Sequence, residues 1–440
     1  MGFDNDASSS SNRLLIPPAM DDATCSNPLL TSSPHPLSSQ TKTFANVFIA
    51  VVGAGVLGLP YTFMKTGWVA GSTMLFTISL LTYYCLMLLV YSRRRLEGNQ
   101  ACKIKSFGDL GYAVSGAPGR VVVDIMIVLS QAGFCASYLI FIANTLANMI
   151  NHSDITVARI AGRRPITNFM GNLGIEPKTI YIWALFPFQL GLNSIKSLTH
   201  LAPLSIFADV VDIGAMGVVM VEDVQIYLEQ STTVYAFTTM SVFFYGVGVS
   251  IYAFEGIGMV LPLESEAANK DKFGMTLGLS MFLITLMYDL FGVLGYFAFG
   301  EDTRDIITMN LGSGLVTNTV QIGLCINLFF SFPIMMNPVH EVLERRFSAG
   351  EFSIWRRYTL VLGVVLVALF VPNFTDFLSL VGSSVCCILG LVLPAFFHLR
   401  AFKDDDLGMT WVVADVALII IGIVFAISGT VSSLTEIISR

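Results

Sequence analysis

The chain has 440 residues, of which 54% are apolar and only 12% are charged, and its formal net charge is -7. Soluble proteins carry about 25% charged residues, so this composition excludes a surface that faces water on every side. The negative net charge also excludes an electrostatic surface for nucleic acid. The seven cysteines include no CxxC pair and no histidine stands at metal-site spacing from them, so we expect neither a metal nor a cofactor. We interpret the chain as an all-α, polytopic membrane protein.

Residues 1–40 are rich in Ser, Pro and Asn and have no periodic apolar face, which predicts a disordered tail in the cytosol. From residue 43 onward, apolar runs of about 20 residues recur, the length that crosses a bilayer as a helix. Because the runs are continuous rather than alternating, they predict helices and not a barrel. We predict eleven spans, at 43–65, 69–91, 120–150, 179–194, 198–220, 236–263, 273–299, 315–338, 358–372, 375–398 and 409–433.

Lysine and arginine indicate how these spans are oriented. Most of the 24 basic residues fall in segments that share a side with the N-terminus, among them the run Arg93-Arg94-Arg95. Positive residues favour the cytosolic side of a membrane. We therefore expect a cytosolic N-terminus and a C-terminus on the opposite, luminal side.

The first and sixth predicted spans are interrupted in the same way. Residues 53–60 of the first span hold three glycines and a proline, and residues 246–262 of the sixth combine glycines with a closing proline. Gly and Pro weaken a helix, and paired interruptions in two halves of a chain indicate a transporter site at the middle of the membrane. Unwound backbone offers N–H groups to a carboxylate and carbonyls to a cation. The alternative is that these glycines serve only close helix packing.

Three segments carry a resemblance to a known family. Gly53–Pro60 followed by Tyr61, Phe254–Glu264, and Phe329–Pro338 closely resemble segments of the amino acid/auxin permease family, most like its plant vacuolar neutral amino acid transporter branch. The similarity runs from Thr43 to the last span. It implies proton-coupled transport of small neutral amino acids by alternating access, with export from the vacuole lumen to the cytosol across the tonoplast.

The resemblance also implies the leucine-transporter-type fold with two inverted repeats of five helices. The expected divisions of the chain are the tail at 1–40, a first repeat at 41–222, a second repeat at 235–399 and an added helix at 408–435. The substrate would bind at the two interruptions. The expected substrate-binding residues are Gly53, Ala54, Gly55, Val56, Tyr252, Ala253 and Phe254.

One departure from the family concerns the coupling ion. The sodium-coupled members resemble this chain but have an asparagine four residues before the first glycine of the first motif, where it helps to hold sodium. Ile49 stands at that position here and has no atom that coordinates a cation. The resemblance therefore favours protons over sodium, and a sodium-coupled carrier remains an alternative.

Carboxylates within the predicted spans are the candidates for proton coupling, because an ionised side chain in the membrane is costly. Glu255 lies inside the second interruption and is the first candidate; Asp209 and Asp212, three residues apart on one helix face, are the next. We expect structural roles for Asp289 and Asp415. Asp124 is expected to pair with Arg120, four residues earlier.

Other classes of protein fit less well. An amino-acid-sensing receptor with little flux is the main alternative, in which the tail would signal. A channel would need a ring of carbonyls or charges, and no such ring is predicted. An enzyme of this kind would need a nucleophile–base pair, and the sequence shows none. The expected partners are therefore small neutral amino acids, protons and lipid.

Overall fold

The computed structural model describes residues 37–99, 103–161, 176–195, 202–229, 232–312, 314–347, 351–403 and 408–439. They lie in one compact unit, Leu37–Arg440. The predicted tail lies outside the described residues as far as residue 36. Within the described ranges the backbone is helical apart from connecting segments and one isolated parallel β-bridge between Ser38 and Ala267.

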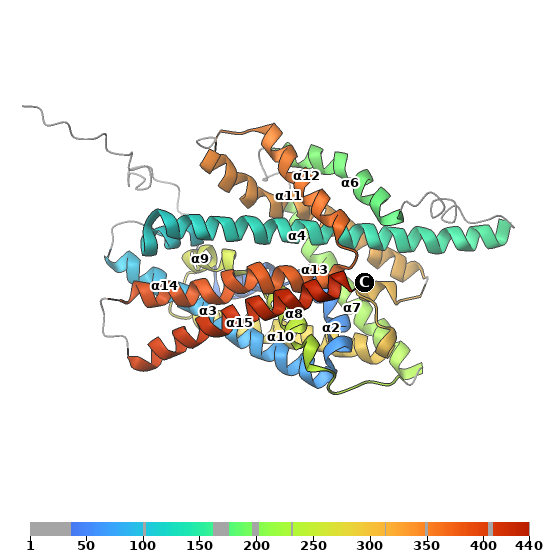
Figure 1. Cartoon of the computed structure of the whole chain (residues 1–440), viewed down its shortest axis with the longest axis horizontal. Helices are drawn as coiled ribbons and strands as arrows, with labels where there is room; N and C mark the ends of the chain where they lie inside the picture. The colour runs from blue at the N-terminus through green and yellow to red at the C-terminus, as the bar shows by residue number, and fades with distance from the viewer. Residues whose placement is uncertain are drawn as a thin grey trace, which may run out of the picture. The chain divides into compact units, whose positions relative to one another are not determined.

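The described residues form eleven helical spans, which we number in chain order (Figure 1). Spans 1 to 5 are α1 (Gln40–Val51) with η1 (Ala54–Gly58) and α2 (Leu59–Thr66), α3 (Trp68–Asn99), α4 (Phe107–Ala161), α6 (Pro177–Asn193) and α7 (Ala202–Glu229). Spans 6 to 9 are α8 (Phe243–Ala253) with α9 (Ile257–Glu266), α10 (Phe273–Phe299), α11 (Leu315–Phe347) and α12 (Ile354–Phe370). Span 10 joins α13 (Phe374–Val381) to α14 (Leu393–Ala401), and span 11 is α15 (Met409–Ile438).

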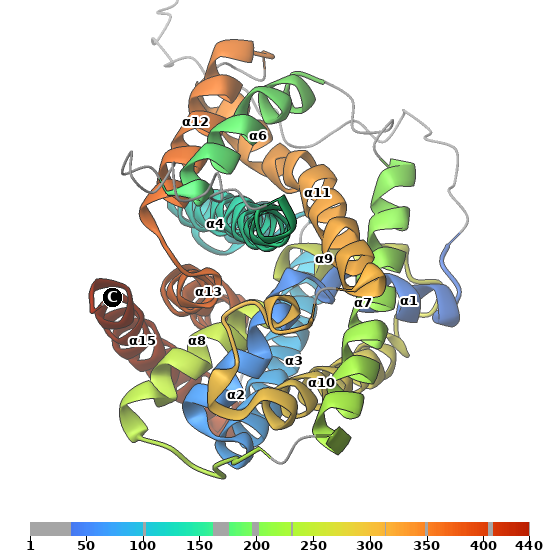
Figure 2. The same ribbon diagram turned by 90° about the vertical axis from the view of Figure 1, so that its right-hand side faces the viewer.

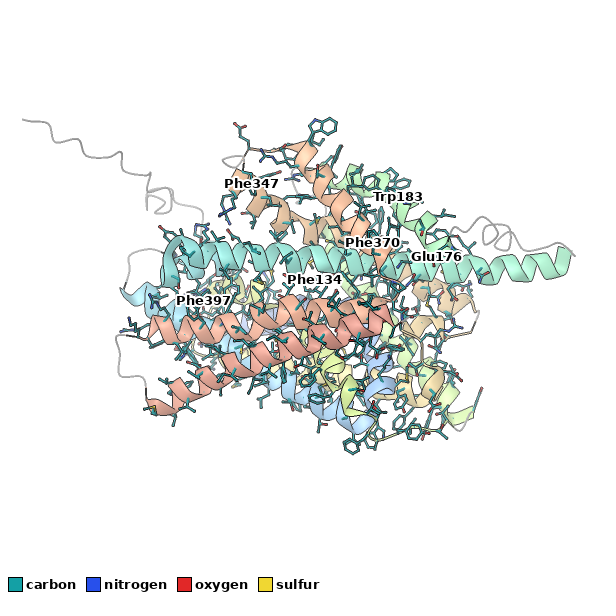
Figure 3. All side chains as sticks on the ribbon, viewed as in Figure 1. Phe134, Glu176, Trp183, Phe347, Phe370 and Phe397 are labelled. Carbon is teal, nitrogen blue, oxygen red and sulfur yellow. The ribbon has the colours of Figure 1, made fainter. Side chains whose placement is uncertain are left out.

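The lengths of these helices suit a membrane. Seven of the spans are each long and apolar enough to cross it, and the bent pair of span 1 makes an eighth. The remaining three are α6 and α12, with 17 residues each, and α7, with 28. Side chains on the outside are apolar, as Trp183 of α6 and Phe370 of α12 show: they are 43% and 82% exposed (Figure 3). The predicted all-helical membrane fold with about eleven spans is confirmed.

One group of spans is joined by buried polar contacts around α4 and α11. Arg345 of α11 binds the Asp124 carboxylate of α4 at 2.9 Å. The predicted pairing of Asp124 with Arg120 is therefore wrong: Arg120 lies 3.4 Å from Asp109 instead. Helix α11 packs against α4 along its length, so its basic end reaches Asp124 from another span.

The same group includes α6 and α12. The Gln189 amide of α6 donates to the Phe329 carbonyl of α11 at 3.0 Å, and His340 of α11 lies 3.1 Å from the Asn193 amide oxygen. Arg357 of α12 binds Glu344 of α11 at 2.8 Å. We call α4, α6, α11 and α12 the scaffold group; α6, α11 and α12 lie on one side of α4 in Figure 2.

A second group, which we call the bundle group, comprises spans 1, 2, 6 and 7. The Tyr288 hydroxyl of α10 donates to the Val51 carbonyl of α1 at 3.2 Å. Arg93 and Arg94 of α3 both pair with the buried carboxylate of Glu264 in α9. Helices α2, α3, α8 and α10 gather on the other side of α4 in Figure 2.

Candidate functional site

Span 1 is interrupted at Gly53. Helix α1 ends at Val51, Gly53 is fully extended with φ -159° and ψ -170°, and the chain resumes as the tight helical turn η1. The two halves of the span are bent by 48°. The first N–H groups of a helix have no partner within it, so the backbone of η1 presents donors at the break. The Val51 carbonyl, freed at the end of α1, accepts the hydrogen bond from Tyr288.

Span 6 is interrupted near its middle, about three helical turns from each end. Helix α8 stops at Ala253, Phe254 and Gly256 leave the helical conformation, and α9 starts at Ile257. The Glu255 N–H bonds the Tyr252 carbonyl at 3.2 Å, which tightens the last turn. Both predicted interruptions are therefore present, and each leaves backbone groups free of helical partners.

The two interruptions touch one another. A Cβ atom added to Gly55 would lie 2.8 Å from the Cα atom of Ala253 and 3.0 Å from the ring of Tyr252. No real Cβ approaches so closely, so only glycine lets η1 lie against the end of α8. Gly53, by contrast, faces open space within 4 Å. The structure thus brings Gly55, Tyr252 and Ala253 together, with open space beside Gly53.

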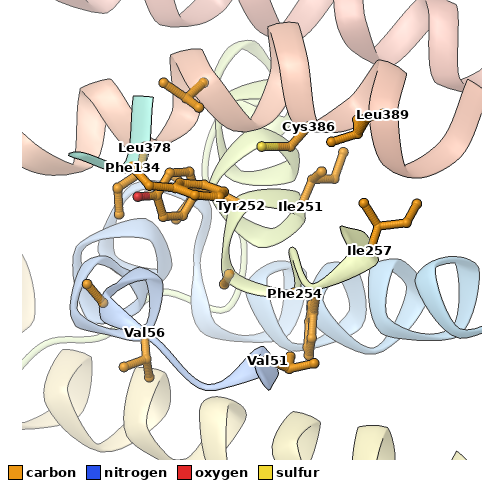
Figure 4. Packing of buried hydrophobic residues seen from close by; sticks show 14 of the residues in the cluster. Val51, Val56, Phe134, Ile251, Tyr252, Phe254, Ile257, Leu378, Cys386 and Leu389 are labelled. Carbon is orange, nitrogen blue, oxygen red and sulfur yellow. The ribbon is translucent and has the colours of Figure 1, made fainter. Parts of the chain in front are cut away.

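Aromatic side chains surround this meeting point (Figure 4). The Tyr252 hydroxyl lies 2.6 Å from the Ser137 hydroxyl of α4, and its ring meets the Phe134 ring edge-on at 4.8 Å. The Phe254 ring packs at 5.4 Å against that of Tyr288. Ala54, Val56, Tyr252, Ala253 and Phe254 are all buried. The side chains at this contact are therefore uncharged, and they are apolar apart from the hydroxyl groups of the two tyrosines and Ser137.

Glu255 lies in the break of span 6 and lines a cavity of its own. Its half-buried carboxyl lines a small cavity together with Thr82 of α3 and with Cys386 and Gly390 of span 10. Within the described ranges no hydrogen bond or ion pair joins the Glu255 side chain to another residue. An unpaired carboxyl group in a membrane interior favours its protonated form.

The other candidate carboxylates lie in different surroundings. The side chain of Asp209 lies outside what the structure describes. Asp212 of α7 is within electrostatic range of the Tyr288 hydroxyl, which places it near the break of span 1. Asp289 of α10 lies near Ser72 of α3, and Asp415 of α15 lies 2.6 Å from the buried His398 ring of α14.

Ile49 does not line the break. It lies on α1 with its side chain 42% exposed and faces away from the interior. An exposed isoleucine side chain on α1 offers no ligand for a cation at the break.

Sequence reasoning missed the contribution of span 10. Between α13 and α14 the chain makes π-helical turns at η6 (Gly382–Cys386) and η7 (Ile388–Val392). A Cβ on Gly382 would lie 1.9 Å from the Gly248 carbonyl oxygen of α8, so this part of span 10 packs directly on span 6. π-helical turns often occur at functional sites. No feature of a uniformly apolar run distinguishes them from an α-helix.

Comparison with solved structures gives the class of protein. The transporter Mhp1 in its inward-facing conformation aligns with a TM-score of 0.55 at 12% identity, over 95% of this chain and 94% of its own. MhsT in complex with L-phenylalanine aligns with a TM-score of 0.51 at 12% identity, over 89% of this chain and 98% of its own. Together with two interrupted helices that meet inside a helical bundle, these define a leucine-transporter-type fold.

The family follows from the sequence as a whole. The model of the family described as transmembrane amino acid transporter protein matches residues 37–438, and this chain belongs to that family. The Arabidopsis thaliana amino acid transporters AVT3C and AVT3A are 62% and 56% identical, over 100% of this chain and 99% of theirs. The amino acid transporter ANT1 of the same plant is 34% identical over 93% of this chain and 96% of its own. The chain is an amino acid transporter.

Proposed function

We propose that this transporter carries small neutral amino acids together with protons, from the vacuole lumen to the cytosol. The observation that carries the proposal is the contact between the two interruptions, where Gly55 lies against Ala253. Such a contact brings the free N–H groups of one half-helix close to the carbonyls of another, which suits the carboxylate and ammonium groups of an amino acid.

The roles of individual residues follow from this arrangement. The N–H groups of Gly53, Ala54, Gly55 and Val56 receive the substrate carboxylate, and carbonyls of Tyr252, Ala253 and Phe254 receive its ammonium group. The open space beside Gly53 supports this assignment. The aromatic rings around the meeting point carry no charge that would bind an acidic or basic side chain.

Proton coupling is assigned to Glu255. A coupled carrier needs a group that takes up and releases a proton during each cycle, and a carboxyl group without a charged partner in the membrane is suited to that role. Glu255 is such a group and follows directly on the ammonium-binding carbonyls. Asp212, near Tyr288, and Asp209 are the alternatives if Glu255 does not carry the proton.

The proposed orientation and location rest on the sequence. Positive residues put the N-terminus in the cytosol, and the resemblance to the vacuolar branch of the family supports the tonoplast. In this proposal, residues 41–222 and 235–399 are the inverted repeats, because each begins with an interrupted span. Residues 408–435 add the eleventh span.

Gly55→Val tests the substrate site. The valine side chain would displace Ala253 and Tyr252, because even its Cβ atom would lie 2.8 Å from Ala253. We expect loss of alanine uptake in reconstituted vesicles by at least ~100-fold, as for misplaced binding groups. Gly363→Val on α12, where no atom lies within 4 Å of an added Cβ, is the matched control and should transport normally. Normal uptake by correctly inserted Gly55→Val protein would refute the site.

A further inference from the structure

A small cavity lies between span 2, the break of span 6 and the π-helical part of span 10. Three residues with polar side chains line it: Glu255, Thr82 and Cys386. The rest of the lining is apolar backbone and side chain, from Ile251, Phe254, Gly256, Ile257, Gly390 and Leu391. Three elements far apart in sequence thus enclose one carboxyl group.

The cavity exists because span 10 leaves space for it. Gly390 lies in the second π-helical stretch, η7, and an added Cβ there would meet no atom within 4 Å. The missing side chain therefore opens the space in front of Glu255. The cavity has room for one water molecule, and the side chains of Glu255 and Thr82 on its lining are of types that hydrogen-bond water.

The groups that face Glu255 from the surrounding elements are uncharged. Span 10 contributes the Cys386 thiol and α3 contributes the Thr82 hydroxyl, while α1 brings Ala50 and Val51 against the adjacent Gly256. In the described part of the chain, no charged side chain acts on the Glu255 carboxyl. A proton can therefore reach or leave it only through water or a neutral hydroxyl.

We propose that this cavity holds the water that exchanges a proton with Glu255, and that Thr82 is the positioning residue for that water. The inference rests on the proposed proton coupling. The Thr82 hydroxyl hydrogen-bonds this water. When Glu255 takes up a proton, a hydronium ion at this position gives it to a carboxylate oxygen and becomes neutral water; when Glu255 releases the proton, the neutral water accepts it and becomes hydronium. No other bond forms or breaks. Gly390, which has no side chain, leaves the cavity open.

Thr82→Val and Thr82→Ser test the positioning role, because valine keeps the shape of threonine and removes its hydroxyl. We measure alanine accumulation driven by a pH gradient and, separately, counterflow of labelled alanine at equal pH on both sides. Thr82→Val should lower the gradient-driven rate about 10-fold, within the range of lost proton-transfer catalysis, with KM and counterflow unchanged. Thr82→Ser should restore the rate. Thr77→Val, on the exposed face of the same helix, is the control.

Gly390→Ala tests the role of the cavity itself. A single methyl group would take the place of the water without a steric clash, and alanine favours a helix over glycine, so the fold should hold. We expect the same loss of gradient-driven rate, with counterflow retained and no further loss on adding Thr82→Val. Gly363→Ala is the matched control, since it too has open space around it.

The outcomes separate this inference from the function on which it rests. Wild-type gradient-driven rates in both Thr82→Val and Gly390→Ala, with Glu255→Gln inactive, would overturn the role of the cavity and leave the proton on Glu255. Loss of counterflow together with gradient-driven uptake in both variants would also overturn it, because that pattern is a structural defect. Wild-type protein that ignores the pH gradient would overturn the proton coupling and the role of the cavity together.

Discussion

Tyr252 connects the two groups of spans at the point where the interruptions meet. Its ring lies against Gly55 in the bundle group, and its hydroxyl lies 2.6 Å from Ser137 in the scaffold group. Both residues are buried, so a loss of either hydroxyl leaves the other without this partner. This hydrogen bond therefore helps to hold in place the face of span 6 that meets span 1.

Tyr252→Phe and Ser137→Ala test this bond. Each removes one neutral hydrogen bond worth about 1 kcal/mol, so we expect the apparent KM for alanine to rise about 5-fold with little change in maximal rate. Because the two hydroxyls act as one pair, the double variant should be no worse than either single one. Losses that simply add, measured as initial uptake rates, would show that the two side chains act independently.

Features of single residues could be predicted where they depend on neighbours in the sequence, and could not be predicted where they depend on distant residues. The glycines of residues 53–60 and the carboxyl in the second interruption are local patterns, and the structure has the breaks where these patterns predict them. The partner of Asp124 could not be predicted, because Arg345 is 221 residues away and only the packing of α11 on α4 brings it close. Ser137 and Thr82 stand in apolar runs with no local signal.

At the scale of elements, α9 is held to α3 by buried charges. The Arg93 side chain is 2% exposed and the Glu264 side chain is fully buried, and the Arg93 guanidinium also donates to the Leu261 carbonyl at 2.7 Å. Arg94 adds a second bond to Glu264 at 2.9 Å. Buried charges of this kind are stable only as a complete set. Helix α9, which is the second half of span 6, and helix α3 therefore form one unit.

Glu264→Gln should break that unit. Removing the negative charge leaves two guanidinium groups facing a neutral amide, which costs about 3–5 kcal/mol when the charges are buried. We expect a clear fall in the midpoint of thermal unfolding of purified, detergent-solubilised protein. Glu266→Gln, two residues later on the exposed side, is the control and should unfold like the wild type. Equal midpoints of thermal unfolding for the two variants would contradict this role of Glu264.

The presence of the helices could be predicted, whereas the detailed geometry of their irregular turns could not. Within the described residues, each of the eleven predicted apolar runs overlaps a helical span, because a run of about 20 apolar residues has few other options in a membrane. The π-helical turns of span 10 were not predictable, since a run that is apolar on every side carries no period to distinguish one helical pitch from another. The cavity beside Glu255 depends on those turns and could not be predicted for the same reason.

For the whole molecule, polar contacts divide most of the spans into two groups. The scaffold group is joined through Asp124, Glu344 and His340, and the bundle group through Glu264 and Tyr288. The hydrogen bond between Tyr252 and Ser137 crosses from one group to the other beside the proposed site. Alternating access by movement of one group against the other would leave the contacts within each group intact.

The measurement that tests the central proposal most directly is alanine accumulation in sodium-free vesicles, with and without an imposed pH gradient. We predict that wild-type protein accumulates alanine above equilibrium only with the gradient. Glu255→Gln, which mimics the protonated carboxyl, should lose accumulation and keep counterflow, whereas Asp289→Asn, at another intramembrane carboxyl, should behave like the wild type. Gradient-driven accumulation that survives in Glu255→Gln, or uptake that ignores pH and follows added sodium, would contradict the proposal.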